Sequence, residues 1–337
     1  MAFKPPSKPM SGNKTLRQMP AAITNKEMNM SSSARNLALA LTLAACGPNI
    51  PASAAPHGPE AAAPGGESVS QPLTTEVYNP GDKAIFAVTS VLVRGTKDAL
   101  LIDAQFSTVD AQRLVELIQG SGKRLTTIYI SHGDPDYYFG LETLKQAFPE
   151  AKILATPQTI AHIEETRVGK LAYWGPILGA GAPKHVVVPE PLQGDLELEG
   201  QKLQVVGLDG PTPDRSFVWI PSIRTVASGI PVIAGEHVWM ADTQTPQSHA
   251  HWLATLAKIE SLQPVRVIPG HFAPGAEQDL QAVRFTADYI KAYDEEAARA
   301  SRSSDLIAAM KRRYPTLGAV SSLELSAKVS KGEMKWP

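Results

Sequence analysis

Two short segments of this chain carry side chains that bind divalent metal ions. In TTIYISHGDPDYYFG, residues 126–140, an apolar and β-branched run leads to His132, which Asp134 and Asp136 follow at alternate positions. In VRVIPGHF, a second apolar run and a Pro-Gly turn lead to His271. Neutral imidazole and carboxylate are good ligands for divalent metals. The pattern predicts a metal site made of these four side chains, although GDPD is also good turn chemistry.

Composition narrows the chemistry of such a site. The 337 residues carry 32 basic and 33 acidic side chains, with no basic stripe interleaved with aromatics, so nucleic acid is not an expected partner. The only cysteine is Cys46, which excludes an internal disulfide framework and a Cys-rich zinc site. Metal binding must therefore use histidines and carboxylates.

The metal-ligating segments follow apolar runs within an alternating pattern of strands and helices. A β-hairpin is predicted for AIFAVTSVLVRG and DALLIDA. A helix capped by Thr108 is predicted for TVDAQRLVELIQGSG, and a strand that ends at His132 is predicted for LTTIYISH. Helix, strand and helix follow in GLETLKQAFPE, AKILATP and TPQTIAHIEETRVGK. The alternation predicts α/β layers, and loops at the carboxyl ends of such strands often carry the functional groups.

The second half repeats this organisation. Five consecutive segments read as strands: HVVVPEPL, DLELEG, QKLQVVGLDG, RSFVWIPS and RTVASGI. A helix follows in SHAHWLATLAKIESLQP, and another strand follows in VRVIPGH. Residues 276–331 read as mostly helical. Two halves, each with strands and then helices, predict two packed sheets with helices outside.

The first 66 residues do not resemble part of a fold. Arg35 precedes a short apolar run from Leu37 to Ala45, which is too short to span a bilayer but suits a signal peptide. The run ends in LAAC, which resembles the bacterial lipobox with Cys46 as the lipidated residue; ASA at 52–54 offers an ordinary cleavage site instead. We expect a periplasmic or secreted envelope protein that meets the membrane only through a lipid anchor at Cys46.

These patterns divide the chain into three parts. They are a leader with a flexible tether (1–66), an α/β domain (67–275) and a helical C-terminal extension packed on it (276–337).

Residues 74–275 resemble the metallo-β-lactamase superfamily. The resemblance rests on SHGDPDYYFG, GLDGPTPDRSFVWIPSIRTVASG, EHVWMADTQTP and VIPGH, which occur in the family's order and with similar spacing. It implies a four-layer αββα sandwich. It also implies ligand positions in a His-x-His-x-Asp-His loop, a later histidine, a bridging aspartate and a final histidine.

The chain departs from the family at several of these positions. His132, Asp136 and His271 match family ligands, and Asp134 stands where the second histidine is expected. The other ligand positions hold Tyr137, Pro211 and Ile230. An alternative alignment makes Glu236 the bridging carboxylate, but the spacing from Pro211 to Ile230 fits the family better.

The altered positions imply a reduced metal centre. Ile230 replaces an anion that would offset the repulsion between two cations, so two occupied sites are not expected. His132, Asp134, Asp136 and His271 imply one divalent ion, with zinc as the first expectation and iron or manganese as alternatives. Asp136 or Asp134 would orient the attacking water, and Tyr137 or Tyr138 would donate to the developing oxyanion.

The resemblance also implies a pocket for a small-molecule substrate. We assign Tyr138, His237, Trp239 and Asp209 to its wall. Alternatively, Trp239 is a packed core residue and Asp209 is a polar residue of a turn. YWGPILGAGAP, residues 173–183, reads as a Gly/Pro-rich loop long enough to overhang the site.

Three functions follow from these observations. The first is a metal-dependent hydrolase with a mononuclear centre. The second is a catalytically inactive binding protein of the same fold, which Pro211 and Ile230 favour. The third, an oxygen-handling iron protein similar to the flavodiiron branch, ranks below both because the sequence has no visible flavin-binding domain.

Overall fold

The computed structural model describes residues 71–210 and 212–336, all of which lie in one contact unit, Gly66–Pro337. Its strands are β1 (Thr74–Tyr78), β2 (Ser90–Arg94), β3 (Asp98–Ile102), β4 (Arg124–Ile130), β5 (Lys152–Ala155), β6 (Glu190–Pro191), β7 (Leu196–Leu198), β8 (Gln201–Val206), β9 (Phe217–Ile220), β10 (Thr225–Ala227), β11 (Ile233–Ala234), β12 (Arg266–Ile268) and β13 (His271–Phe272). Its α-helices are α1 (Thr108–Gly120), α2 (Pro135–Tyr138), α3 (Leu141–Ala147), α4 (Pro157–Leu178), α5 (Pro246–Ser261), α6 (Leu280–Arg299), α7 (Ser303–Arg313) and α8 (Val320–Ser330).

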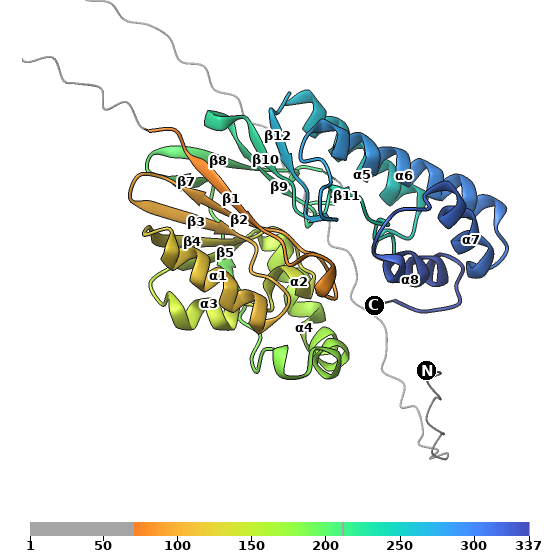
Figure 1. The fold of residues 1–337 in the computed structure, drawn as a ribbon, viewed down its shortest axis with the longest axis horizontal. Coiled ribbons are helices and arrows are strands. Elements are labelled where there is room, and N and C mark those ends of the chain that lie inside the picture. The colour runs from red at the N-terminus through yellow and green to blue at the C-terminus, as the bar shows by residue number, and fades with distance from the viewer. Residues whose placement is uncertain (1–70, 211, 337) are drawn as a thin grey trace, which may run out of the picture. The chain divides into compact units, whose positions relative to one another are not determined.

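The strands form two main sheets (Figure 1). The first has the order β1-β2-β3-β4-β5-β6, and the second has the order β12-β10-β9-β8-β7. A short parallel pair, β11 and β13, joins Ile233 to His271. The predicted hairpin is confirmed, since β2 and β3 pair in antiparallel register with Val91 opposite Ile102.

Alternation of side chains along the strands separates two cores. In β2, Val91 and Val93 point to the core between the sheets, whereas Leu92 points to the outer face. The inter-sheet core also holds residues of the second sheet, among them Val218 and Ile268. Because successive side chains of a strand point to opposite faces, each fully buried strand contributes to both cores.

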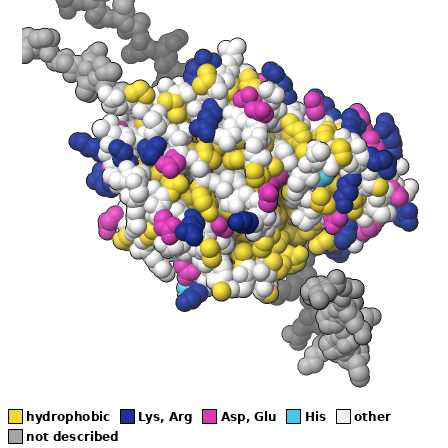
Figure 2. All heavy atoms as spheres, in the orientation of Figure 1, with side chains coloured by type: hydrophobic (Ala, Val, Ile, Leu, Met, Phe, Trp, Pro, Cys, Tyr) yellow, Lys and Arg dark blue, Asp and Glu magenta, His cyan; other side chains and the backbone are white. Residues whose placement is uncertain are grey.

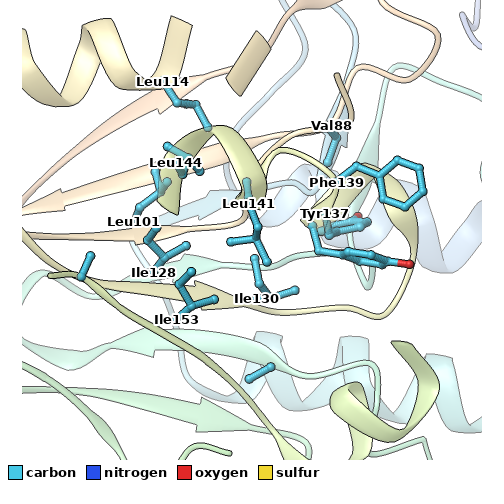
Figure 3. Close-up of a cluster of buried hydrophobic side chains, with 14 of the residues drawn as sticks. Val88, Leu101, Leu114, Ile128, Ile130, Tyr137, Phe139, Leu141, Leu144 and Ile153 are labelled. Atoms are coloured by element: carbon cyan, nitrogen blue, oxygen red, sulfur yellow. The ribbon is translucent and has the colours of Figure 1, made fainter. Parts of the chain in front are cut away.

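Helices cover the outer face of each sheet. Figure 3 shows Leu101, Ile128 and Ile130 of the first sheet facing the leucines of α1 and α3. On the second sheet, α5 to α8 share another core that contains Trp252, Tyr289 and Leu323. The predicted four-layer αββα sandwich is therefore confirmed, with additional helices after the last strand.

Two local predictions differ from the structure, and one strand was missed. Ser107, rather than Thr108, caps α1, because its side chain accepts a hydrogen bond from the Asp110 amide. The first strand, β1, was not predicted. The segment 173–183 is not a plain loop: α4 continues to Leu178 despite Pro176, and Trp174 packs against the rings of Phe86 and Phe106.

Among residues 71–210 and 212–336, no helix is both long enough and apolar enough to cross a membrane.

Candidate metal centre

The loop that carries His132 is fixed at its base by a buried aspartate. Asp103 follows β3, and its carboxylate accepts hydrogen bonds from the Ser131 amide at 2.8 Å and the Ser131 hydroxyl at 2.7 Å. Burial raises the pKa of Asp103 to about 7, although both bonds from Ser131 act in the opposite direction. This contact holds the carboxyl end of β4 in place, and no sequence pattern assigned a role to Asp103.

His132 is oriented by a backbone carbonyl. Its Nδ1 donates to the Asp214 carbonyl at 3.1 Å, and its Nε2 lies 3.3 Å from Asp134 Oδ2. Metal-binding histidines use such a second hydrogen bond to fix the ring and its tautomer. Burial alone lowers the pKa of His132, but Asp134 raises it above the ordinary value.

Asp134 is the most strongly paired carboxylate of the site. It accepts a hydrogen bond from the Lys170 ammonium of α4, and its Oδ1 lies 4.0 Å from His162 Nε2. Burial raises the pKa of Asp134, but Lys170 and His132 together hold it well below its usual range. Gly133 allows α4 to approach, because a Cβ there would lie 2.6 Å from the His162 ring.

A third ligand comes from a distant part of the chain. Ligand atoms of His132, Asp134 and Asp242 all lie within 4.8 Å of one another. The Asp242 carboxylate also accepts hydrogen bonds from the indole nitrogens of Trp239 and, at 2.7 Å, Trp336. Burial, and then Asp134, raise the pKa of Asp242 to about 6.

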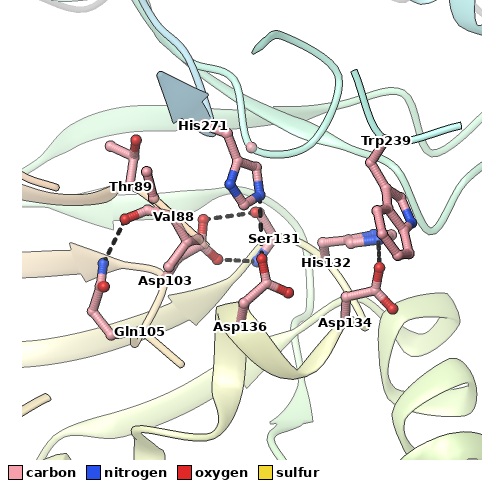
Figure 4. Close-up of polar contacts among 12 residues, drawn as sticks. Val88, Thr89, Asp103, Gln105, Ser131, His132, Asp134, Asp136, Trp239 and His271 are labelled. Atoms are coloured by element: carbon pink, nitrogen blue, oxygen red, sulfur yellow. Dashed lines mark hydrogen bonds and ion pairs between the residues drawn. The ribbon is translucent and has the colours of Figure 1, made fainter. Parts of the chain in front are cut away.

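The other two predicted ligands form a separate pair (Figure 4). His271 Nε2 lies 3.2 Å from Asp136 Oδ2. Burial lowers the pKa of His271, whereas Asp136 raises it, and the net pKa lies above the ordinary value. The four predicted side chains are therefore brought together as two pairs, His132–Asp134 and Asp136–His271.

Tyr137 lies between the two histidines, with ring centroids 5.3 Å from His132 and 5.7 Å from His271. It is fully buried, and its hydroxyl has no hydrogen-bond partner among the described residues. Burial raises the pKa of Tyr137 well above its usual value, so the group is a neutral phenol. It packs in the outer core of the first sheet, which argues against its predicted role as an oxyanion donor.

A buried arginine lies close enough to the site to affect the pKa of Asp242. Arg215 is 5% exposed, and its guanidinium carbon lies 4.4 Å from the ring centroid of Trp252. Burial and Asp134 raise the pKa of Asp242, and the charge of Arg215 opposes them without reversing the shift. No pattern in the sequence distinguished Arg215 or Lys170 from other basic residues.

A cavity of about 360 Å³ lies beside the site, and neither His132 nor Asp242 lines it. Asp134, Asp136 and His271 lie on its wall, and so do the predicted pocket residues His237 and Trp239. Figure 2 shows hydrophobic side chains gathered on this face, between the loop before β2 and α8.

Two residues assigned to the pocket lie elsewhere. Tyr138 is fully buried in the outer core of the first sheet and does not line the cavity. Asp209 is exposed in the turn after β8, also outside the cavity. Ile230 and Glu236 do line it. Cys46 and Pro211 lie outside the described residues.

The donor set fits one divalent cation. One imidazole and two carboxylates converge, and the imidazole already has its supporting hydrogen bond. A second cation between Asp136 and His271 would meet the apolar Ile230 on the wall and the neutral phenol of Tyr137.

Comparison with known proteins identifies the family of this chain. Residues 85–271 match the profile of the metallo-beta-lactamase superfamily, which is more than half of the chain. The chain belongs to this superfamily. Membership supports a metal-dependent hydrolase at the level of the family, and metal binding is general in it.

Individual relatives of this superfamily member are distant. The chain is 30% identical over 104 residues to the uncharacterized protein YobT of Bacillus subtilis (strain 168), which is 31% of this chain and 44% of that protein. The metallo-beta-lactamase family protein TTHA1429 from Thermus thermophilus matches with a TM-score of 0.50 and 17% identity over 76% of this chain and 93% of its own. A metallo-beta-lactamase from Pontibacter korlensis matches with a TM-score of 0.48 and 16% identity over 66% of this chain and 96% of its own. The likeness to TTHA1429 supports the fold alone.

Proposed function

We propose that this chain is a metal-dependent hydrolase of small molecules with a mononuclear centre held by His132, Asp134 and Asp242. The observation that carries the proposal is the convergence of these three ligand groups within 4.8 Å, beside a cavity. A bound divalent ion supplies a nucleophile by lowering the pKa of water. Zinc is the first expectation, and two carboxylate ligands make manganese or iron the alternatives.

One remaining polar group of the wall suits another need of hydrolysis. Asp136, which is paired with His271, is the candidate to accept a proton from the attacking water. Tyr137 and Tyr138 are buried away from the cavity, so neither is a candidate to stabilise the developing oxyanion.

Elemental analysis of the full chain, purified without chelator, tests the centre. We expect about one equivalent of metal, lost in His132→Ala and in Asp242→Asn but retained in His271→Ala. If the metal is lost in His271→Ala but retained in Asp242→Asn, the ligands are instead His132, Asp134, Asp136 and His271. A screen of ester, lactone and amide substrates with the metal-loaded chain then tests hydrolysis.

The second candidate is a binding protein without a metal. Its specific support is the ion pair between Lys170 and Asp134, which neutralises a ligand carboxylate without any metal ion. Absence of metal from the wild-type chain, even after incubation with zinc, manganese and iron, would decide for this function.

For its location, we propose attachment to the bacterial envelope through Cys46, on the support of the sequence LAAC. Incorporation of a labelled fatty acid that is lost in Cys46→Ala tests this, and a soluble, unlabelled product would contradict it.

A further inference from the structure

The wall of the cavity is acidic. Four carboxylates line it, contributed by Asp82, Asp134, Asp136 and Glu236. Among the described residues that line it, Lys170 is the only Lys or Arg, and its ammonium is already paired with Asp134. A negatively charged ligand would therefore meet no free cationic side chain on this wall.

Two carboxylates of the wall lack a protein partner, and of these Glu236 is half-buried whereas Asp82 is exposed. The Glu236 side chain has no hydrogen bond or ion pair with any of the described residues, whereas Asp134 and Asp136 each have at least one. The flanking backbone is fixed, because the His237 amide donates to the Gly318 carbonyl at 3.0 Å and the Gly318 amide donates to the Gly235 carbonyl at 3.1 Å. The Glu236 carboxylate is thus held on the wall without a hydrogen-bond or ion-pair partner among the described residues.

The groups that face Glu236 do not neutralise it. Burial raises its pKa, His271 opposes this effect, and Asp82 adds to it. His271 is engaged by Asp136. The neighbouring His237 is neutral, because burial lowers its pKa to about 4 and its Nδ1 is hydrogen-bonded to Tyr289. A cation that enters the cavity would satisfy this carboxylate.

Aromatic rings line the same cavity. Phe86 lies 5.3 Å from Trp174 and 6.0 Å from Trp239, and Trp239 lies 5.2 Å from Trp336, between ring centroids. The Lys170 ammonium lies 5.8 Å from the ring centroid of Trp336. Aromatic faces attract cations, and desolvated cages of such rings bind quaternary ammonium groups.

We propose that the cavity binds a substrate that carries an amine or quaternary ammonium group on an apolar body, with Glu236 as the counter-charge. The volume of about 360 Å³ suits a small molecule. The apolar body packs on Phe86, Trp174 and Trp239, and the hydrolysable bond is directed to Asp134 and Asp136, which line the same cavity. This inference deepens the proposed hydrolase function by naming its substrate class.

The test compares three ligands that share a phenyl group and differ in charge: benzyltrimethylammonium, benzyl alcohol and phenylacetate. Binding to the chelator-treated full chain is followed by tryptophan fluorescence and by calorimetry. We expect benzyltrimethylammonium to bind tightest and phenylacetate weakest. Glu236→Gln should weaken binding of the cation about tenfold, as expected for loss of one partly screened charge pair, and leave benzyl alcohol within twofold.

A matched control is Glu197→Gln, since Glu197 is exposed on β7 and does not line the cavity. It should leave all three affinities unchanged. Phenylacetate binding as tightly as the cation, or unchanged cation binding in Glu236→Gln, overturns the inference.

The readout also separates this inference from the hydrolase proposal. Because binding is measured without metal, a chain that selects the cation but holds no metal overturns only the hydrolase. A chain that holds one metal but shows no preference for the cation overturns only the substrate class.

Discussion

The Lys170 ammonium forms an ion pair with the Asp134 carboxylate beside the cavity, and the two side chains are only 5% and 12% exposed. Asp134 belongs to the group of three residues whose ligand atoms converge. The protein therefore carries an internal cation next to the place where a metal ion would bind. This relationship means that Lys170 and a metal ion compete for the same carboxylate charge.

Replacement of Lys170 by methionine should strengthen metal binding about tenfold or more, because a positive charge a few ångströms from the metal is removed. The metal-free variant should lose about 3 kcal/mol of unfolding free energy, since one partner of a buried pair is left alone. Calorimetric titration with zinc and urea unfolding check the two effects. Lys152→Met, at an exposed position of β5, is the control. Weaker metal binding in Lys170→Met would contradict the competition.

Ile230→Asp should allow a second metal ion to bind. Ile230 lines the cavity and is 3% exposed, at the position where the family resemblance implies a bridging carboxylate. An added anion would offset repulsion between two cations. Elemental analysis should give an additional equivalent of metal in Ile230→Asp but not in Ile230→Asn. If both variants bind the wild-type amount, position 230 does not face a second site.

Asp103 should make stability depend on pH. Burial raises its folded pKa from 3.8 to about 7, so its contribution to stability is fully present below about pH 4 and is lost as the pH rises through 7. Between pH 5 and pH 8, the free energy of unfolding of the wild type should therefore fall by roughly 2–3 kcal/mol more than that of Asp103→Asn. Urea unfolding at the two pH values measures this, with Asp209→Asn as an exposed control. Equal pH dependence in wild type and Asp103→Asn would show that Asp103 is ionised throughout.

The ring of Trp336 should contact a cation bound in the cavity. It lies 5.2 Å from Trp239 between ring centroids, and its indole donates to Asp242. Trp336→Ala should weaken benzyltrimethylammonium binding about fivefold, which is the size of one partly exposed cation–π contact. Trp336→Phe keeps the ring and should stay within twofold of the wild type. Equal affinities in Trp336→Ala and wild type would place the ligand away from this ring.

The sequence by itself predicted the elements whose signals are local. The buried run before His132 defines β4, helical spacing defines α1 and α5, and the Pro-Gly turn positions His271 at the start of β13. The alternation of strands and helices predicted two packed sheets with helices outside, and the resemblance to the superfamily implied the αββα sandwich.

The tertiary structure alone decided which side chains meet. Asp242 joins His132 and Asp134 although 108 positions separate it from Asp134, and Lys170 and Arg215 lie in ordinary helix or loop sequence. It also decided that Tyr137 and Tyr138 face the core rather than the cavity. Periodicity reports burial along one element, whereas a ligand set depends on distances between elements, which long-range packing alone determines.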